Sequence, residues 1–224
     1  MSKKKTSREP SVRVRTAKGR TTSSTRWLQR QLNDPYVAKA EQAGYRSRAA
    51  FKLIEINDKL DFLKPSMKII DLGAAPGGWC QVAAQKKCEV IGLDILEIDP
   101  LPGVTTIQMD FMDDQAPERL IKAMGSTKAD VVMSDMAPNT TGHKNTDHLR
   151  IMALVEAAYS FAQDVLKPDG IFLAKVRQGG TEHDLLAQMK KDFKTIKHIK
   201  PPASRKESAE TYVIAQGYRA DHDA

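Results

Sequence analysis

The chain has 224 residues, of which 41% are hydrophobic and 28% are charged, which suits one globular domain with a short extension. No run of about 18 apolar residues occurs, so we expect no membrane partner and a cytoplasmic location. The two cysteines, Cys80 and Cys88, fit neither a zinc site nor a disulfide framework, and we expect no bound metal.

The formal net charge of +7 is concentrated near the N-terminus. Residues 1–30 contain ten Lys or Arg and one acid, Glu9, so the rest of the chain is slightly negative. Residues 1–24 also have few large apolar side chains, which predicts a basic tail that is disordered until bound. Such a tail favours a polyanion such as RNA, with a solubilising arm as the alternative. The main domain would span residues 25–224.

The first expected elements are two helices, and from Lys68 onward short apolar strands alternate with helices. The two helices are Asn33–Ala43 and Ser47–Leu60. The five strands are Lys68–Leu72, Cys88–Leu93, Val104–Met109, Ala129–Ser134 and Gly170–Val176. The helices between them are Trp79–Gln85, Pro117–Met124, His148–Leu166 and Glu182–Asp192. Pro and Gly chemistry predicts a turn at residues 167–170.

Alternating strands and helices are typical of an α/β fold with a mostly parallel sheet. Two further strands, Thr195–Ile199 and Thr211–Gln216, have no room for a helix between them. We expect them to form an antiparallel pair at one edge, because a parallel pair needs a longer crossover. The prediction is a Rossmann-like fold with a seven-stranded, mostly parallel sheet.

Charged residues recur at or near the carboxyl ends of the predicted strands. They are Asp71, Asp94, Asp110, Asp135 and Lys175. Ligands bind at this edge of open α/β sheets. One acid after a strand is commonly a helix cap, but four acids and a lysine in succession indicate a ligand site.

The segment 71–79, with the sequence DLGAAPGGW, joins the first of these strands to a helix. Its glycines allow backbone to approach a ligand, and the free N–H groups at the start of a helix suit a carboxylate. The dinucleotide and P-loop patterns are both absent, so the loop is not built around a pyrophosphate. The residues expected to bind a cofactor here are Asp71, Gly73, Pro76, Gly77, Gly78 and Trp79.

Asp94 lies about 20 residues beyond the loop, where an acid would bind ribose hydroxyls. A ligand with a ribose for Asp94 and an amino-acid carboxylate for the glycine loop indicates S-adenosylmethionine. Asp110 would then face the adenine amine. The alternative is that these residues are only turn glycines and capping acids.

Several motifs in the same order closely resemble the FtsJ/RrmJ family over about residues 25–217. They are residues 47–53 (SRAAFKL), 71–79, 134–139 (SDMAPN), 175–176 and 210–212 (ETY). The resemblance implies an S-adenosylmethionine methyltransferase that modifies the ribose 2′-hydroxyl of a uridine in 23S ribosomal RNA, within the large subunit. It also implies a four-residue catalytic site, here Lys52, Asp135, Lys175 and Glu210.

In this interpretation Lys175 is the candidate base, because a ribose hydroxyl is a weak nucleophile. Lys52 and Glu210 would orient the ribose and Lys175. Asp135 would lie between cofactor and acceptor and would also contact the cofactor. Burial and a second ammonium favour a neutral lysine, whereas Asp135 and Glu210 favour a charged one, so the sequence leaves its protonation state open.

Two other functions remain as alternatives. A base methyltransferase is disfavoured because the turn after Asp135 lacks an aromatic residue to stack on a flipped base. A non-catalytic RNA-binding assembly factor would be expected to have lost part of the four-residue site, and this chain keeps all four. DNA is not expected as a substrate, because it lacks the 2′-hydroxyl.

Overall fold

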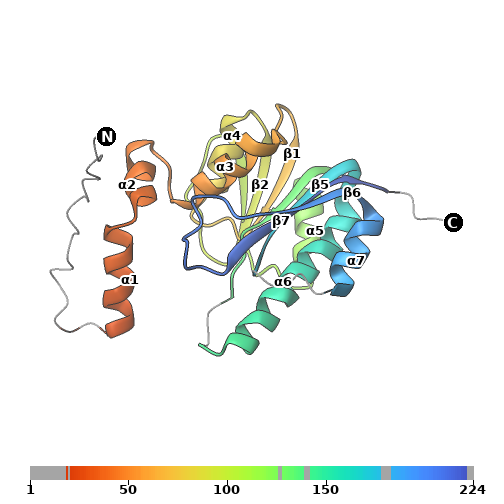
Figure 1. Ribbon diagram of the computed structural model, residues 1–224. Helices are drawn as coiled ribbons and strands as arrows, with labels where there is room; N and C mark the ends of the chain where they lie inside the picture. The colour runs from red at the N-terminus through yellow and green to blue at the C-terminus, as the bar shows by residue number, and fades with distance from the viewer. Residues whose placement is uncertain (1–18, 20, 126–127, 139–141, 178–182, 221–224) are drawn as a thin grey trace, which may run out of the picture.

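The computed structural model describes residue 19 and residues 21–125, 128–138, 142–177 and 183–220 (Figure 1). The helices are α1 (Thr22–Leu32), α2 (Pro35–Gln42), α3 (Ala49–Leu60), α4 (Gly78–Gln85), α5 (Ala116–Ala123), α6 (Lys144–Val165) and α7 (His183–Asp192). The strands are β1 (Lys68–Leu72), β2 (Glu89–Asp94), β3 (Val104–Gln108), β4 (Ala129–Ser134), β5 (Leu166–Arg177), β6 (Phe193–Ile199) and β7 (Glu210–Tyr218). No helix within these ranges is long and apolar enough to cross a bilayer.

The strands form one seven-stranded sheet in the order β3-β2-β1-β4-β5-β7-β6. The neighbours from β3 to β5 are parallel, whereas β7 runs antiparallel to both β5 and β6. The predicted fold class, including the antiparallel pair at one edge, is therefore confirmed. Strand order reverses between β1 and β4, which is where α/β sheets bind ligands.

Helices cover both faces of the sheet (Figure 1). Leu53 and Ile56 of α3 are completely buried in one core cluster that also contains Trp79 of α4. Tyr159 of α6 and Met189 of α7 belong to a second cluster. The sheet thus separates two apolar cores, and burying each large side chain contributes about 1.5–3 kcal/mol.

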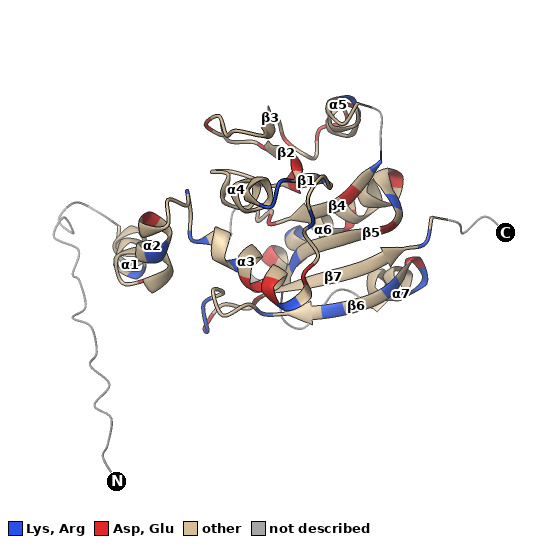
Figure 2. Ribbon diagram, turned by 90° about the horizontal axis from the view of Figure 1, so that it is seen from above, with Lys and Arg blue, Asp and Glu red and all other residues tan. Residues whose placement is uncertain are grey.

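Helix α1 was not predicted, and it begins inside the tail that was expected to be disordered. Thr21 caps it by accepting a hydrogen bond from the Ser24 backbone N–H at 3.2 Å, so residues 22–24 are helical. Residues 1–18 and 20 of the tail lie outside the described residues. Asp34 caps α2 in the same way, and Pro35 occupies its first position. Both helices stand to one side of the sheet (Figure 2).

The turn predicted at residues 167–170 is a bulge within β5. Leu166 pairs with Ala129 of β4, and the pairing resumes at Ile171 with Val131. Asp169 has a φ of 63° inside the bulge. The sequence thus located the irregular backbone correctly but placed the start of the strand after it.

Candidate active site

The parallel register brings the charged residues after the strands together. Leu72 of β1 pairs with Leu93 of β2 and with Ser134 of β4, and Ser134 pairs with Ala174 of β5. The residues that follow these partners are Asp94, Asp135 and Lys175. The sheet therefore presents two carboxylates and one amine at the same edge.

The glycine loop after β1 folds back onto β2. The backbone N–H groups of Gly73 and Ala74 donate to the Leu93 carbonyl at 2.9 and 3.2 Å, and that of Ala75 donates to Asp94 Oδ2 at 2.9 Å. Gly77 has a φ of 105°, and a Cβ there would lie 2.9 Å from Leu101 Cδ1. This backbone conformation is one that residues with a side chain rarely adopt, so the position favours glycine.

Arg46 fixes the outer side of this loop and was not singled out from the sequence. Its guanidinium donates to the carbonyl oxygens of Pro76, Asp99 and Pro100 at 3.2, 2.6 and 2.8 Å. These bonds connect the glycine loop to the segment between β2 and β3. Carbonyl acceptors cannot be read from side-chain patterns, so the sequence carried no signal for this contact.

Asp71 and Trp79 were expected to bind the cofactor, but both side chains are buried. The Asp71 carboxylate is completely buried, accepts from the Cys80 thiol at 3.1 Å, and has its pKa raised to about 7 by burial. The indole of Trp79 is also buried, where its Nε1–H donates to the Ala49 carbonyl at 2.9 Å. The backbone N–H of Trp79 belongs to the first turn of α4, where helix N–H groups have no intrahelical acceptor.

Asp94 and Asp110 remain accessible at the ends of β2 and β3. Asp94 is partly exposed and Asp110 is exposed, and each accepts from a backbone N–H two residues ahead. Large apolar side chains next to them are also exposed: Ile95 by 61%, Leu96 by 63% and Met112 by 53%. Polar groups beside exposed apolar side chains suit a ligand with both a ribose and an aromatic base.

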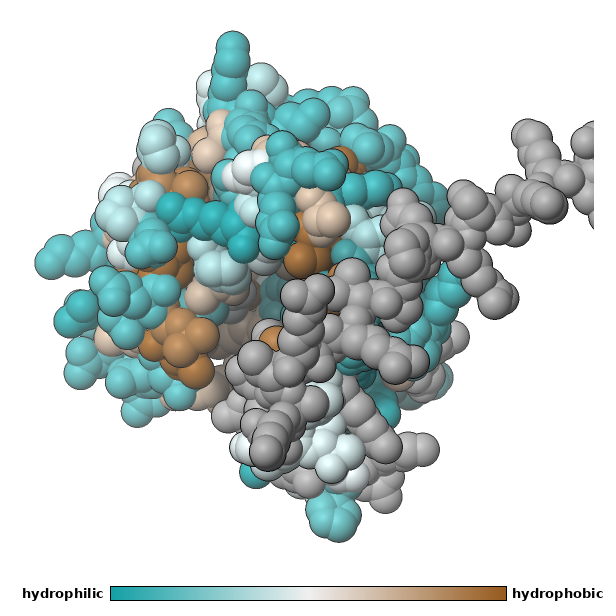
Figure 3. All heavy atoms as spheres, turned by 90° about the vertical axis from the view of Figure 1, so that its left-hand side faces the viewer, coloured by the Kyte–Doolittle hydropathy of each residue, from teal (hydrophilic) through white to brown (hydrophobic). Residues whose placement is uncertain are grey.

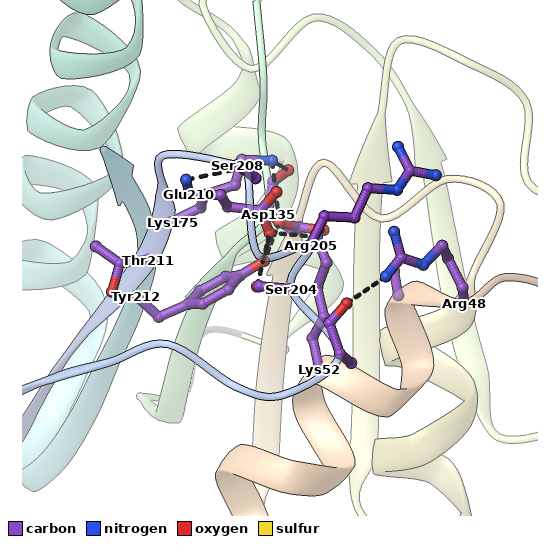
Figure 4. Close-up of polar contacts among 12 residues, drawn as sticks. Arg48, Lys52, Asp135, Lys175, Ser204, Arg205, Ser208, Glu210, Thr211 and Tyr212 are labelled. Carbon is purple, nitrogen blue, oxygen red and sulfur yellow. Dashed lines mark hydrogen bonds and ion pairs between the residues drawn. The ribbon is translucent and has the colours of Figure 1, made fainter. Parts of the chain in front are cut away.

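Lys52, Asp135, Lys175 and Glu210 form one connected network (Figure 4). Lys175 Nζ lies 3.0 Å from Asp135 Oδ1 and also donates to the Asp135 carbonyl oxygen. Lys52 Nζ lies 3.7 Å from Asp135 Oδ2 and forms an ion pair with Glu210. Their side chains are only 11–24% exposed, so little solvent screens these charges. The structure thus brings all four predicted residues together from α3, β5, β7 and the end of β4.

Tyr212 completes the network, and the sequence analysis gave it no role. Its hydroxyl lies 2.8 Å from Asp135 Oδ1 and 2.7 Å from Glu210 Oε1. It has one proton, so it donates to one carboxylate at a time. The spacing of Glu210 and Tyr212, two residues apart on a strand and therefore on one face, was the available signal.

The charges of the network determine which groups keep their protons. Burial opposes ionisation of Asp135, but Lys175, Lys52 and the Tyr212 hydroxyl outweigh it and hold the Asp135 pKa below its usual value. Burial, together with the two carboxylates, raises the Tyr212 pKa well above its ordinary value. Asp135 is therefore an anion at neutral pH, and Tyr212 remains a neutral hydrogen-bond donor.

Comparison with known proteins identifies the family. The model of the FtsJ-like methyltransferase family matches residues 45–218. The chain belongs to this family. It is 60% identical over 218 residues to ribosomal RNA large subunit methyltransferase E of Xanthobacter autotrophicus, covering 95% of this chain and 85% of that protein. It is 58% identical over 225 residues to the protein of the same name from Paramagnetospirillum magneticum, covering 97% and 92%.

Solved structures agree with the family assignment. A crystal structure from Plasmodium falciparum, assigned as a ribosomal RNA methyltransferase, has a TM-score of 0.70 and 32% identity over 78% of this chain and 98% of that chain. The MycE methyltransferase, with a TM-score of 0.51, 15% identity and coverage of 75% and 50%, shares the fold.

The residues at this edge of the sheet fit S-adenosylmethionine, the methyl donor expected of an FtsJ-like methyltransferase. The positive φ of Gly77 disfavours any side chain at this point of the loop, which suits close approach of a ligand to the backbone. Asp94 offers a partly exposed carboxylate to a ribose, and Asp110 an exposed one to an adenine amine. The exposed apolar side chains that follow these carboxylates closely in the chain are Ile95, Leu96 and Met112.

Proposed function

We propose that this FtsJ-like methyltransferase methylates the ribose 2′-hydroxyl of a uridine in 23S ribosomal RNA, within the large ribosomal subunit and in the cytoplasm. The observation that carries the proposal is the closed network of Lys52, Asp135, Lys175 and Glu210 beside the glycine loop. The names of the bacterial relatives support the ribosomal substrate. The site residues are proposed with the roles that follow.

Asp71, Gly73, Pro76, Gly77, Gly78, Trp79, Asp94, Asp110 and Asp135 would form the cofactor site. The loop residues would act through their backbone, because Trp79 has its indole in the core. Asp71 would act from beneath the loop, because its carboxylate is completely buried. When bound, S-adenosylmethionine supplies a methyl group made electrophilic by its sulfonium.

In the proposed reaction Lys175 prepares the acceptor. Asp135 holds Nζ through a carboxylate oxygen and a carbonyl oxygen, which leaves the third direction at the amine for the ribose hydroxyl. As the methyl group moves to the ribose oxygen, the hydroxyl proton would pass to the lone pair of an unprotonated Lys175 amine. Lys52 and Glu210 would hold the ribose in line with the methyl group. Positioning of this kind can contribute several kcal/mol.

The basic stretch 1–24 would add electrostatic affinity for RNA. Its final residues belong to α1, so the proposed contact with RNA would come from the residues before the Thr21 cap. Phosphate contacts of this kind increase affinity without selecting a sequence.

The test is the chemical identity of the product. Large subunits from cells lacking the gene are incubated with purified protein and methyl-labelled cofactor, and the RNA is digested to nucleosides for mass spectrometry. We expect label in a 2′-O-methyluridine. Label in a base-methylated nucleoside would contradict the proposal, and so would absence of transfer to large subunits. Small subunits serve as the matched control.

A further inference from the structure

Two neighbouring hollows, which share several lining residues, lie beside the catalytic network. The outer one has a volume of about 460 Å³ and lies between α1, the start of α2 and residues 202–207. The inner one, of about 230 Å³, is lined by Lys52 and Glu210 of the network. Arg30, Arg48 and Arg205 line both. A chain bound at the catalytic residues can therefore leave the site between these arginines.

Arg48 and Arg205 share a single carboxylate, that of Asp34. Arg48 Nη1 lies 3.0 Å and Arg205 Nε lies 3.2 Å from the same Asp34 oxygen, and the Asp34 side chain is only 6% exposed. Asp34 is thus shared by two guanidinium groups, and Glu55, which accepts from the Ala203 N–H, is a second carboxylate in the same cluster. Arg48 Nε is buried and has no hydrogen-bond partner among the described residues, so the protein does not satisfy this guanidinium fully.

The arginines are held in place from several elements. Arg48 precedes α3 and also donates to the Ala203 carbonyl, whereas the Ala203 N–H donates to Glu55 of α3 at 2.6 Å. These bonds attach the segment between β6 and β7 to α3. Figure 4 shows both guanidinium groups on the same side of the catalytic network. A preorganised cation pair of this kind loses little entropy when it binds an anion.

The lining of both hollows is positive in balance. The cationic side chains are Arg30, Arg48, Lys52, Arg205 and Lys206, and the carboxylates are Asp34, Glu207 and Glu210. Hydrophilic side chains predominate over the described part of the side that carries α1 and α2 (Figure 3). Guanidinium pairs in polar hollows are suited to phosphate, which they bind through paired N–H donors.

We infer that Arg48 and Arg205 bind the phosphodiester on the 3′ side of the acceptor ribose, and that the outer hollow receives the next nucleotide. This inference rests on the proposed function. The 2′-carbon of a ribose is bonded to the 3′-carbon, which carries that phosphodiester, so this phosphate must lie close to a reacting 2′-hydroxyl. Arg48 lies one helical turn before Lys52, which matches this proximity. A hollow of about 460 Å³ is large enough for one nucleotide.

Kinetics test the phosphate contact. Arg205→Met should raise KM for large subunits about tenfold or more, because a charge-assisted hydrogen bond is lost. The slope of log affinity for RNA against log salt concentration should also become shallower by about the amount that one phosphate contact contributes. The dissociation constant for S-adenosylmethionine should not change. The matched control is Lys122→Met, which removes one positive charge from α5, a helix that lines neither hollow. Equal KM values for the two variants would overturn the inference.

A crosslinking experiment tests the position. Arg205→Cys is labelled with a photoreactive aryl azide, bound to large subunits and irradiated, with labelled Lys122→Cys as the control. The unmodified chain measures background, because Cys80 and Cys88 are buried. We expect crosslinks at the nucleotide immediately 3′ of the methylated ribose. Crosslinks on its 5′ side, or at distant nucleotides, would overturn the inference. The methylated ribose is mapped on the same subunits, so failure of the proposed function would show separately as absence of ribose methylation.

Discussion

Replacing Lys175 with Met should abolish most methyl transfer while leaving the fold and the cofactor site intact. Lys175 Nζ is 3.0 Å from Asp135 Oδ1, and its side chain is only 13% exposed, so no water can easily take its place. Loss of a general base or positioning group typically lowers the rate by about 10²–10⁴-fold, which corresponds to about 3–5 kcal/mol.

The cost to stability should be smaller. Removing one partner of a fully buried ion pair costs about 3–5 kcal/mol, but Asp135 keeps Lys52 at 3.7 Å and the Tyr212 hydroxyl at 2.8 Å. We therefore expect the free energy of unfolding to fall by about 1–2 kcal/mol, a range typical of single substitutions. Thermal unfolding measures this directly.

The assay is single-turnover methyl transfer to large subunits, together with calorimetric binding of S-adenosylmethionine. Lys194→Met is the matched control, since Lys194 is a strand lysine paired with Asp169 but 59% exposed. Lys175→Arg should remain inactive, because guanidinium keeps its proton and differs in shape. A near-normal rate in Lys175→Met would refute the assignment. Recovery in Lys175→Arg would show a purely electrostatic role.

Three further predictions concern the cofactor site, the core and the tail. Asp94→Ala should weaken S-adenosylmethionine binding by about 1.5–3 kcal/mol for each ribose hydrogen bond lost, whereas calorimetry on exposed Asp99→Ala should show no change; equal affinities would exclude Asp94. Burial raises the Asp71 pKa to about 7, so the wild-type protein loses stability as the pH rises from about 4 to 7. Asp71→Asn lacks this titration. The difference in unfolding free energy between variant and wild type, measured by chemical denaturation, should therefore grow in favour of the variant by about 2–3 kcal/mol from pH 5 to pH 8. A pH-independent difference would contradict this burial effect. Deleting residues 2–20, which keeps the Thr21 cap, should flatten the salt dependence of RNA binding without changing cofactor affinity, and an unchanged slope would exclude an electrostatic role.

The sequence predicted the sheet well because its strands are short apolar runs with charged residues after them. β1 and β4 have the predicted bounds, β3 ends one residue earlier than predicted, and β2 is shifted by one residue at both ends. The helix α1 was missed because basic and small polar residues dominate its sequence, which contains few apolar residues. Thr21 could have indicated the start of this helix, but a threonine identifies a cap only when the helix after it is already known.

The candidate site was predictable in its charged residues and not in the contacts that hold them. Lys52, Asp135, Lys175 and Glu210 come together as the resemblance implied. The Asp34 pair with two arginines depends on tertiary packing between α2 and the segment before β7, which no local pattern encodes. Similarly, Asp71 has the sequence pattern of a ligand residue, although its carboxylate is buried beneath the loop.

The most direct test of the central claim is to map 2′-O-methylation across ribosomal RNA from cells with and without the gene. The account predicts one uridine 2′-O-methyl group in 23S RNA that is present in wild-type cells, is lost without the gene, and is restored by the wild-type protein but not by Lys175→Met. An unchanged ribose methylation pattern, or loss of a methyl group from a base, would contradict it.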